Sequence, residues 1–234
     1  LWANDDRSSS DWSNARLIFL ISSHAADAGH YFQQSARQIA EARKKGAKLV
    51  VLDPRLSNSA GMADLWIPCW PGSEAAIQLA IAGRLIKERR YNREFVRRWW
   101  NWQDFMASKD THQLLLEQGF ITKLPAGEGF EAFEAFMEDM YGAYTLEWAA
   151  EQARVPLSKL ETLYEYFLYA GDRVASFHWR ATAAGNRGGW MSSSRTGIFL
   201  ISLLGNYSGV GALGYHHGRE IAVAGKGGKS TVGE

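Results

Sequence analysis

Two short motifs place polar side chains where buried runs of residues end. In "LVVLDPRLSNSA", Asp53 closes an apolar run and Arg55 follows two residues later. A carboxylate there can accept hydrogen bonds from ribose hydroxyls or from the amino edge of a base, and a flat guanidinium can lie along a phosphate or a purine face. In "PGSE", Ser73 and Glu74 follow a turn and open a helix, again suited to a base edge or a phosphate. Together the motifs favour a nucleotide site, although a strand-end Asp is also typical of turns and helix caps.

A third segment, "GKGGKST" at residues 225–231, resembles the phosphate loop of ATPases. Such a loop needs G-x-x-x-x-G-K-[ST], so that enough backbone amides encircle the β-phosphate before the lysine and hydroxyl arrive. Here only two residues separate Gly225 from Gly228, and the residues after Ser230 are too few for the helix that would hold the phosphate. A P-loop-type ATPase is therefore a remote alternative.

Other reactive side chains find little support. The single cysteine, Cys69, excludes an internal disulfide, a cysteine-rich zinc site and an iron–sulfur cluster held by this chain alone. Its apolar surroundings, "DLWIPCW", predict a buried core residue. The serines at 192–194 lack the G-x-S-x-G setting of a hydrolase nucleophile. Four histidines are expected in surface or turn positions: His30, His112, His216 and His217.

Composition and charge limit the partners. The chain has 26 Lys and Arg against 25 Asp and Glu, a net charge of +1, which is unlike the one-sided basic face of a nucleic-acid binder. Its longest clean apolar run, residues 197–204, is shorter than the roughly 20 residues of a membrane-spanning helix. We therefore expect a globular chain with no nucleic-acid partner and no membrane span, either soluble or membrane-associated through partners. Because the sequence starts without Met, a piece of a longer protein is expected.

The elements that position the motifs alternate between strands and helices. Residues 15–21 and 47–53 are short apolar runs typical of parallel strands buried on both faces. The segment between them has an apolar helical face and ends at Gly46, a helix stop. A shorter strand at 64–69 precedes a helix whose first turn Ser73 is expected to cap. This order predicts an α/β fold: a Rossmann-like doubly wound parallel sheet with flanking helices.

The second half of the chain is first helical and then returns to a strand. Residues from about 91 to 170 read as helices, with Pro156 starting the last and Gly171 just past its end. A strand at 172–179 leads into a glycine-punctuated loop and another helix. Its tryptophans are expected in core or interface packing: Trp99, Trp100, Trp102 and Trp148. We expect residues 1–172 to form one domain and residues 173–234 to begin a neighbouring α/β segment.

The loop after the first strand argues against a standard dehydrogenase. Ligands of open α/β sheets bind outside the carboxyl ends of the strands, where loops and helix N-termini offer N–H groups. The loop here, "ISSHAADAG", contains no G-x-G-x-x-G, so the usual NAD or FAD fingerprint is missing.

The ordered series of motifs resembles the molybdopterin oxidoreductases of the dimethyl sulfoxide reductase family. In that family a strand, a helix, "GAKLVVLDPR", an "A..AD" segment and a "PG[ST][DE]..AL" turn follow at the spacing seen here. "YNREFV" and "SSSRTGIFLISLLGNYSGVGALG" extend the likeness, so that it covers residues from about 11 to 214. The resemblance implies the central portion of a larger enzyme that holds molybdenum or tungsten between two pterin guanine dinucleotides.

The resemblance also implies which residues contact the cofactor. The guanosine-diphosphate arm of one cofactor would lie against three strand ends, namely Ser22, His24, Asp27, Asp53, Arg55, Gly72, Ser73 and Glu74. His178, Trp179 and Arg180 would approach a pterin, and Arg195 matches an arginine near the metal in some relatives. His24 stands where the family's "G-x-N-P" usually has Asn. The pair His178-Trp179 is similar to the nitrate-reductase-like branch.

Several parts of such an enzyme would lie outside this chain. In relatives the metal ligand, and commonly an iron–sulfur cluster, come upstream of the matched region, so no metal ligand is assigned here and the fragment alone is expected to be inactive. The implied partners are the remainder of the catalytic subunit, an electron-transfer subunit with iron–sulfur clusters, and a small-molecule substrate that exchanges an oxygen atom or electrons. A second hypothesis is a metal-free, non-catalytic scaffold subunit of the same fold.

Overall fold

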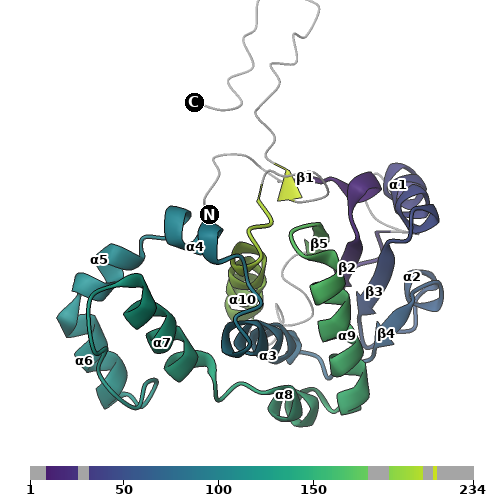
Figure 1. The fold of residues 1–234 in the computed structure, drawn as a ribbon. Coiled ribbons are helices and arrows are strands. Elements are labelled where there is room, and N and C mark those ends of the chain that lie inside the picture. Colours follow the sequence, from purple (N-terminus) through teal and green to yellow (C-terminus); the bar gives the residue numbers. More distant parts are fainter. Residues whose placement is uncertain (1–8, 26–31, 179–189, 208–212, 215–234) are drawn as a thin grey trace, which may run out of the picture.

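A computed structural model describes residues 9–25, 32–178, 190–207 and 213–214 (Figure 1). Its centre is a four-stranded sheet in which every neighbouring pair is parallel. In spatial order the strands are β4 (Leu65–Ile67), β3 (Lys48–Leu52), β2 (Leu17–Ile21) and β5 (Val174–His178). The predicted doubly wound parallel sheet is confirmed, because helices cover both faces of it.

The register aligns the carboxyl ends of all four strands. Ile21 lies opposite both Leu52 and His178, and Leu52 lies opposite Ile67. From β2 the chain builds the sheet outward through β3 to β4 and then crosses back to place β5 on the other side of β2. The strand order therefore reverses between β2 and β5, which is where ligands bind in sheets of this kind.

Alternate residues of β2 enter two separate cores. Leu17, Phe19 and Ile21 belong to the core shared with α3 (Glu74–Lys87), α9 (Leu157–Ala170) and α10 (Trp190–Leu203). Ile18 and Leu20 belong to the core on the other face, which α1 (Phe32–Lys44) covers with Ile39 and Ala42. Side chains of successive strand residues point to opposite faces, so a strand buried on both sides is apolar throughout.

A helical lobe follows α3 and occupies the left of Figure 1, except for its last helix, which lies at the bottom of the picture near α9. Its helices are α4 (Arg93–Trp99), α5 (Trp102–Ala107), α6 (Lys109–Glu117), α7 (Phe130–Tyr141) and α8 (Leu146–Ala153). As predicted, Trp100, Trp102 and Trp148 pack against the core. Trp99 does not: its side chain is exposed and stacks with Arg98.

The helix stops expected from glycine are confirmed. Gly46 follows α1 with φ +96° and Gly171 follows α9 with φ +58°, a backbone region that favours glycine. The short elements were not predicted: η1 (Trp12–Asn14), α2 (Asn58–Gly61) and the antiparallel pair β1 (Ser9–Ser10) with β6 (Leu213–Gly214). The expected domain boundary at 172/173 falls just before β5, which joins this same sheet; the division into two domains stays a prediction.

The helical lobe also corrects one expectation. His112 was expected at the surface or in a turn, but it is buried in α6, where its ring lies 5.0 Å from that of Phe105 and 5.6 Å from that of Phe136, centroid to centroid. Aromatic residues of α5 and α7 close over it, a contact that its local sequence does not reveal. Within the described ranges, no helix combines the length and apolar character that crossing a membrane requires.

Candidate cofactor-binding site

Three loops meet at the carboxyl edge of the sheet, after β2, β3 and β4. Backbone hydrogen bonds continue between neighbouring strands for one residue beyond their ends: Ser22 N–H donates to Leu52 C=O at 2.9 Å, and Asp53 N–H donates to Ile67 C=O at 3.2 Å. The loops are therefore held side by side from their first residues. We call this region the carboxyl edge, defined by Ser22, His24, Asp53, Arg55, Gly72, Ser73 and Glu74.

Asp53 is the central acidic group of the carboxyl edge. Its side chain is almost completely buried, and its Oδ1 atom accepts a hydrogen bond from the Arg55 N–H at 2.8 Å. Its carbonyl oxygen accepts another from the indole N–H of Trp66 at 2.7 Å. The Oδ2 atom lies 3.8 Å from Nε2 of His24, which carries a charge only when protonated. The carboxylate is thus fixed by its neighbours, while the Arg55 side chain is exposed.

A proline-glycine turn forms the β4 side of the carboxyl edge. Ser73 N–H donates to Trp70 C=O at 3.0 Å, with Pro71 and Gly72 as the central residues and Gly72 at φ +96°. This is the arrangement of a type II turn, which favours glycine at its third position. The expected cap by Ser73 is wrong: its hydroxyl donates to Trp70 C=O at 2.6 Å and makes no cap hydrogen bond. Its backbone, at φ −95° and ψ 2°, does not have the extended conformation of a capping residue.

Glu74 is the fully buried member of the carboxyl edge and joins two of its loops. Its side chain is fully buried at the first turn of α3, where the partial positive charge of the helix N-terminus favours an anion. Oε2 accepts the Gly72 N–H at 2.9 Å, and Oε1 accepts the hydroxyl of Ser22 at 3.5 Å. Ser22 itself has a left-handed backbone, at φ 47°, that turns the chain away from β2. The structure therefore gives Glu74 a role in holding loops together.

The pKa of the Cys69 thiol is affected by the buried carboxylates near it. Burial and then the negative charge of Glu74 raise its pKa to about 12, and Asp53 adds to the effect. A thiol with this pKa is neither a nucleophile nor a ready metal ligand at neutral pH, and its predicted burial is confirmed. Glu74 is fully buried and already accepts hydrogen bonds from Gly72 and Ser22, so Asp53 is the carboxylate suited to ligand groups that donate hydrogen bonds, such as base N–H groups or ribose hydroxyls.

Comparisons with known proteins show the family and the fold of the chain. The family model for molybdopterin oxidoreductases matches residues 4–225. The chain belongs to this family. A catalytic chain of a dimethyl sulfoxide reductase from Halobacterium salinarum is 33% identical over 123 residues, which are 53% of this chain and 14% of that protein. The periplasmic nitrate reductase of Desulfovibrio desulfuricans is 27% identical over 151 residues, 64% of this chain and 17% of that protein.

A solved structure shows the same fold. Acetylene hydratase from Pelobacter acetylenicus matches with a TM-score of 0.63 at 21% identity, over 88% of this chain and 23% of that one. The molybdopterin family implies a molybdopterin cofactor with molybdenum or tungsten. The chain spans less than a fifth of the length of the two curated relatives. Members of the family thus have much more polypeptide than the chain contains.

The remaining residues that the family resemblance singled out are only partly described. His178 ends β5 opposite Ile21, so its backbone lies at the carboxyl edge. Arg195 is exposed on α10, and the hydroxyl of the next residue, Thr196, donates to Oε1 of Gln78 on α3 at 2.7 Å. Three of the predicted contact residues lie outside the described residues, namely Asp27, Trp179 and Arg180. The segment at 225–231 lies outside them as well. In the described ranges, no three His, Cys, Asp or Glu side chains cluster so that they could hold a metal ion.

Two tryptophans beside the carboxyl edge of this molybdopterin-family chain were not predicted as site residues from the sequence. Trp66 fixes the Asp53 loop, as described above, and Trp70 precedes the proline-glycine turn with its ring about half exposed. Their signal was present in "LWIPCWPG", where two large rings flank the end of an edge strand. Both tryptophans lie in one apolar run of the sequence. A pattern of hydrophobic residues does not distinguish a ring buried in the core from a ring that lies in a loop at the surface.

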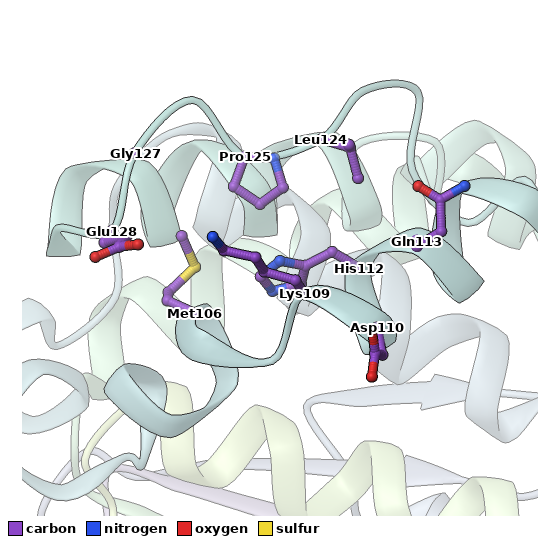
Figure 2. A pocket seen from close by; sticks show the side chains of 9 residues that line it. All are labelled: Met106, Lys109, Asp110, His112, Gln113, Leu124, Pro125, Gly127 and Glu128. Atoms are coloured by element: carbon purple, nitrogen blue, oxygen red, sulfur yellow. The ribbon is translucent and has the colours of Figure 1, made fainter.

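The helical lobe contains a cleft that lies away from the carboxyl edge (Figure 2). It has a volume of about 480 Å³ and lies between α5, α6 and the loop that precedes α7. Its charged side chains have both signs, Lys109 against Asp110 and Glu128, and most of its lining is exposed. The Nε2 atom of His112 lacks a hydrogen-bond partner there, but it is buried out of reach of solvent. None of the residues predicted to bind the cofactor lines this cleft.

Proposed function

We propose that the chain binds the guanosine-diphosphate arm of a pterin guanine dinucleotide and forms the cofactor-binding portion of a molybdenum or tungsten oxidoreductase. One observation carries this proposal: a fixed, buried carboxylate, that of Asp53, lies at the carboxyl end of β3, which pairs with β2, one of the two strands between which the strand order reverses. Guanosine offers hydrogen-bond donors to such a group through its base and its ribose. Membership of the molybdopterin family supplies the cofactor that contains this nucleoside.

The residues of the carboxyl edge fit that group in distinct ways. Asp53 would accept hydrogen bonds from the base or ribose, and the exposed Arg55 would pair with the diphosphate. A Cβ added to Gly72 would meet nothing within 4 Å, so the turn leaves open space where a ligand could approach. Ser22 and His24 would contact the same arm from the β2 loop. Glu74, fully buried, would act by holding the Ser22 and Gly72 loops in place.

The residues outside this geometry keep the roles that the resemblance implies. Asp27 would join the nucleotide contacts, His178, Trp179 and Arg180 would approach a pterin, and Arg195 would lie near the metal and substrate. Residues 1–172 would form the nucleotide-binding domain, and residues 173–234 would begin its neighbour. When bound, the metal and its pterins supply the redox chemistry, and the protein binds, orients and tunes them.

The reaction of the whole protein is proposed at the level of class. Matched relatives include dimethyl sulfoxide reductases, a nitrate reductase, a formate dehydrogenase and an acetylene hydratase, so the family spans different reactions. We propose oxygen-atom or electron transfer with a small substrate; a place in the nitrate-reductase-like branch stays a prediction. Some relatives are named as subunits, which supports partner chains, including the remainder of the catalytic subunit and an electron-transfer subunit with iron–sulfur clusters.

The rival hypothesis is a metal-free scaffold of the same fold. The loop after β2 supports this hypothesis, because Ser22-Ser23-His24 stands there in place of the start of the family's usual G-x-N-P. The native protein that contains this chain should be purified from its source and analysed for molybdenum and tungsten, with acid release of the pterin. Metal together with a guanine-containing pterin supports the enzyme. Protein that contains neither supports the scaffold, and bound ATP without pterin would favour the remote phosphate-loop alternative.

A further inference from the structure

An exposed aromatic ring and a cation lie together beside the proline-glycine turn. The guanidinium carbon of Arg154 is 4.3 Å from the centroid of the Trp70 ring, and Trp70 is 47% exposed. Trp70 is the first residue of the turn that carries Gly72 and Ser73. The pair, which we call the Trp70–Arg154 platform, therefore borders the carboxyl edge on its β4 side.

The backbone beneath the platform is held firmly. Trp70 N–H donates to Ala153 C=O at 2.9 Å, and Trp70 C=O accepts both the N–H and the hydroxyl of Ser73. Pro71 restricts the conformation of the residue before it. Arg154 ends α8 in a left-handed conformation, φ 55° and ψ 43°, and its N–H donates to Glu151 C=O at 3.3 Å. A rigid ring that remains half exposed offers contact area at little entropic cost.

We propose that the Trp70–Arg154 platform binds the purine base of the nucleotide at the carboxyl edge. This inference rests on the proposed function and names the part of the chain that recognises the base. The indole ring supplies a flat surface on which a base can stack, and the adjoining guanidinium strengthens the contact. Guanine carries N–H donors at N1 and N2 on one edge, which suit a carboxylate such as Asp53. Adenine has neither of these donors, so guanine is preferred.

The chain contains a matched control for the platform. Trp99 is also an exposed tryptophan, and its ring lies 5.1 Å from the guanidinium carbon of Arg98. It belongs to α4 in the helical lobe, not to a loop of the carboxyl edge. Trp70→Leu and Trp99→Leu therefore each remove an exposed indole ring that contacts an arginine. Only Trp70→Leu removes a ring beside the carboxyl edge.

The test measures binding of GDP, ADP and ribose 5-phosphate to the 234-residue chain by isothermal titration calorimetry. Trp70→Leu should weaken GDP binding by about fivefold to a hundredfold and leave ribose 5-phosphate, which has no base, unchanged. Trp70→Phe should restore most of the GDP affinity because it keeps an aromatic face. Trp99→Leu should bind GDP as the unaltered chain does, and circular dichroism of each variant checks that it is folded.

Each outcome decides between the two proposals. If the unaltered chain binds GDP and Trp70→Leu binds it equally well, the platform is wrong and the proposed nucleotide site stands. Equal loss of GDP and ribose 5-phosphate binding in folded Trp70→Leu would give the ring a structural role and also overturn the platform. If the unaltered chain binds neither GDP nor ADP, the proposed nucleotide site fails and the platform fails with it.

Discussion

The hydroxyl of Ser22 donates a hydrogen bond to Oε1 of Glu74 at 3.5 Å, although 52 residues separate them in the chain. The other oxygen of the same carboxylate accepts the Gly72 N–H at 2.9 Å. The buried side chain of Glu74 therefore ties the loop after β2 to the turn after β4, on either side of the Asp53 loop.

Removing this carboxylate should loosen the carboxyl edge. We expect Glu74→Ala to lower the free energy of unfolding by about 1–3 kcal/mol, because the Gly72 N–H and the Ser22 hydroxyl lose their acceptor. Glu74→Gln keeps a carbonyl oxygen and should lose less. Urea denaturation measures both, with Glu94→Ala as control, since Glu94 is an exposed acid in the first turn of α4. Equal stability of Glu74→Ala and Glu94→Ala would contradict the joining role.

The stability of the helical lobe should depend on pH because of the carboxyl group of Glu134. Burial raises the pKa of this buried carboxyl, but hydrogen bonds from Arg93, at 2.5 and 2.6 Å, and from Tyr91 outweigh it and hold the pKa below its ordinary value of 4.5. A lowered folded-state pKa contributes stability above the ordinary value, and this stability is lost as pH falls through the folded-state pKa.

Glu134→Gln should therefore be less stable than the unaltered chain at pH 7, by about 1–3 kcal/mol. The difference should shrink when urea denaturation is repeated at pH values well below 4.5, where the unaltered carboxyl also becomes neutral. Glu138→Gln, an exposed position on the same helix, is the control. A difference between Glu134→Gln and the unaltered chain that stays constant across this range would show that the charge of Glu134 contributes nothing.

Gly83 allows α3 to approach the end of α7. A Cβ at this position would lie 2.8 Å from the carbonyl oxygen of Tyr141 and 3.0 Å from that of Tyr144. Because backbone atoms cannot rotate aside, Gly83→Ala should destabilise the fold by about 1–3 kcal/mol, measured as a lower urea midpoint. Gly61→Ala in α2 meets nothing within 4 Å and should shift stability by less than about 1 kcal/mol. An unchanged midpoint for Gly83→Ala would show that this approach is looser than described.

Cys69 gives a simple test of the buried sheet end. It is the single cysteine of the chain, and burial next to Glu74 raises the pKa of its thiol to about 12. At pH 8 the folded protein should therefore react negligibly with a thiol reagent such as 5,5′-dithiobis(2-nitrobenzoate), and one equivalent should react after unfolding in urea. Rapid reaction of the folded protein would mean that the end of β4 is open to solvent.

The sequence predicts the parts of this fold whose local pattern matches their environment. The apolar runs of β2 and β3 are buried on both faces, and Gly46 and Gly171 stop helices where a left-handed residue is needed. It fails where the local pattern leaves more than one partner open, or where the partner is distant. Ser73 turns its hydroxyl back to Trp70, three residues earlier, instead of capping α3, and His112 is enclosed by aromatic rings that come from other helices.

The residues of the candidate site likewise divide into those that local sequence predicts and those that depend on contacts made in the fold. Asp53 could be found because it directly follows a buried strand. The burial of Glu74 depends on Ser22, far away in the chain, and the pairing of Trp70 with Arg154 depends on how α8 ends. Neither contact is encoded in the residues next to it.

Binding of a guanosine nucleotide at the carboxyl edge is tested most directly by titrating the ¹⁵N-labelled chain with GDP and following its amide chemical shifts. The shifts should concentrate at residues 22–24, 53–55 and 72–74. They should largely disappear in Asp53→Asn, which can keep the hydrogen bond to the Arg55 N–H but loses the charge. Shifts confined to other parts of the chain, such as residues 225–231, or no shifts at saturating GDP, would contradict the account.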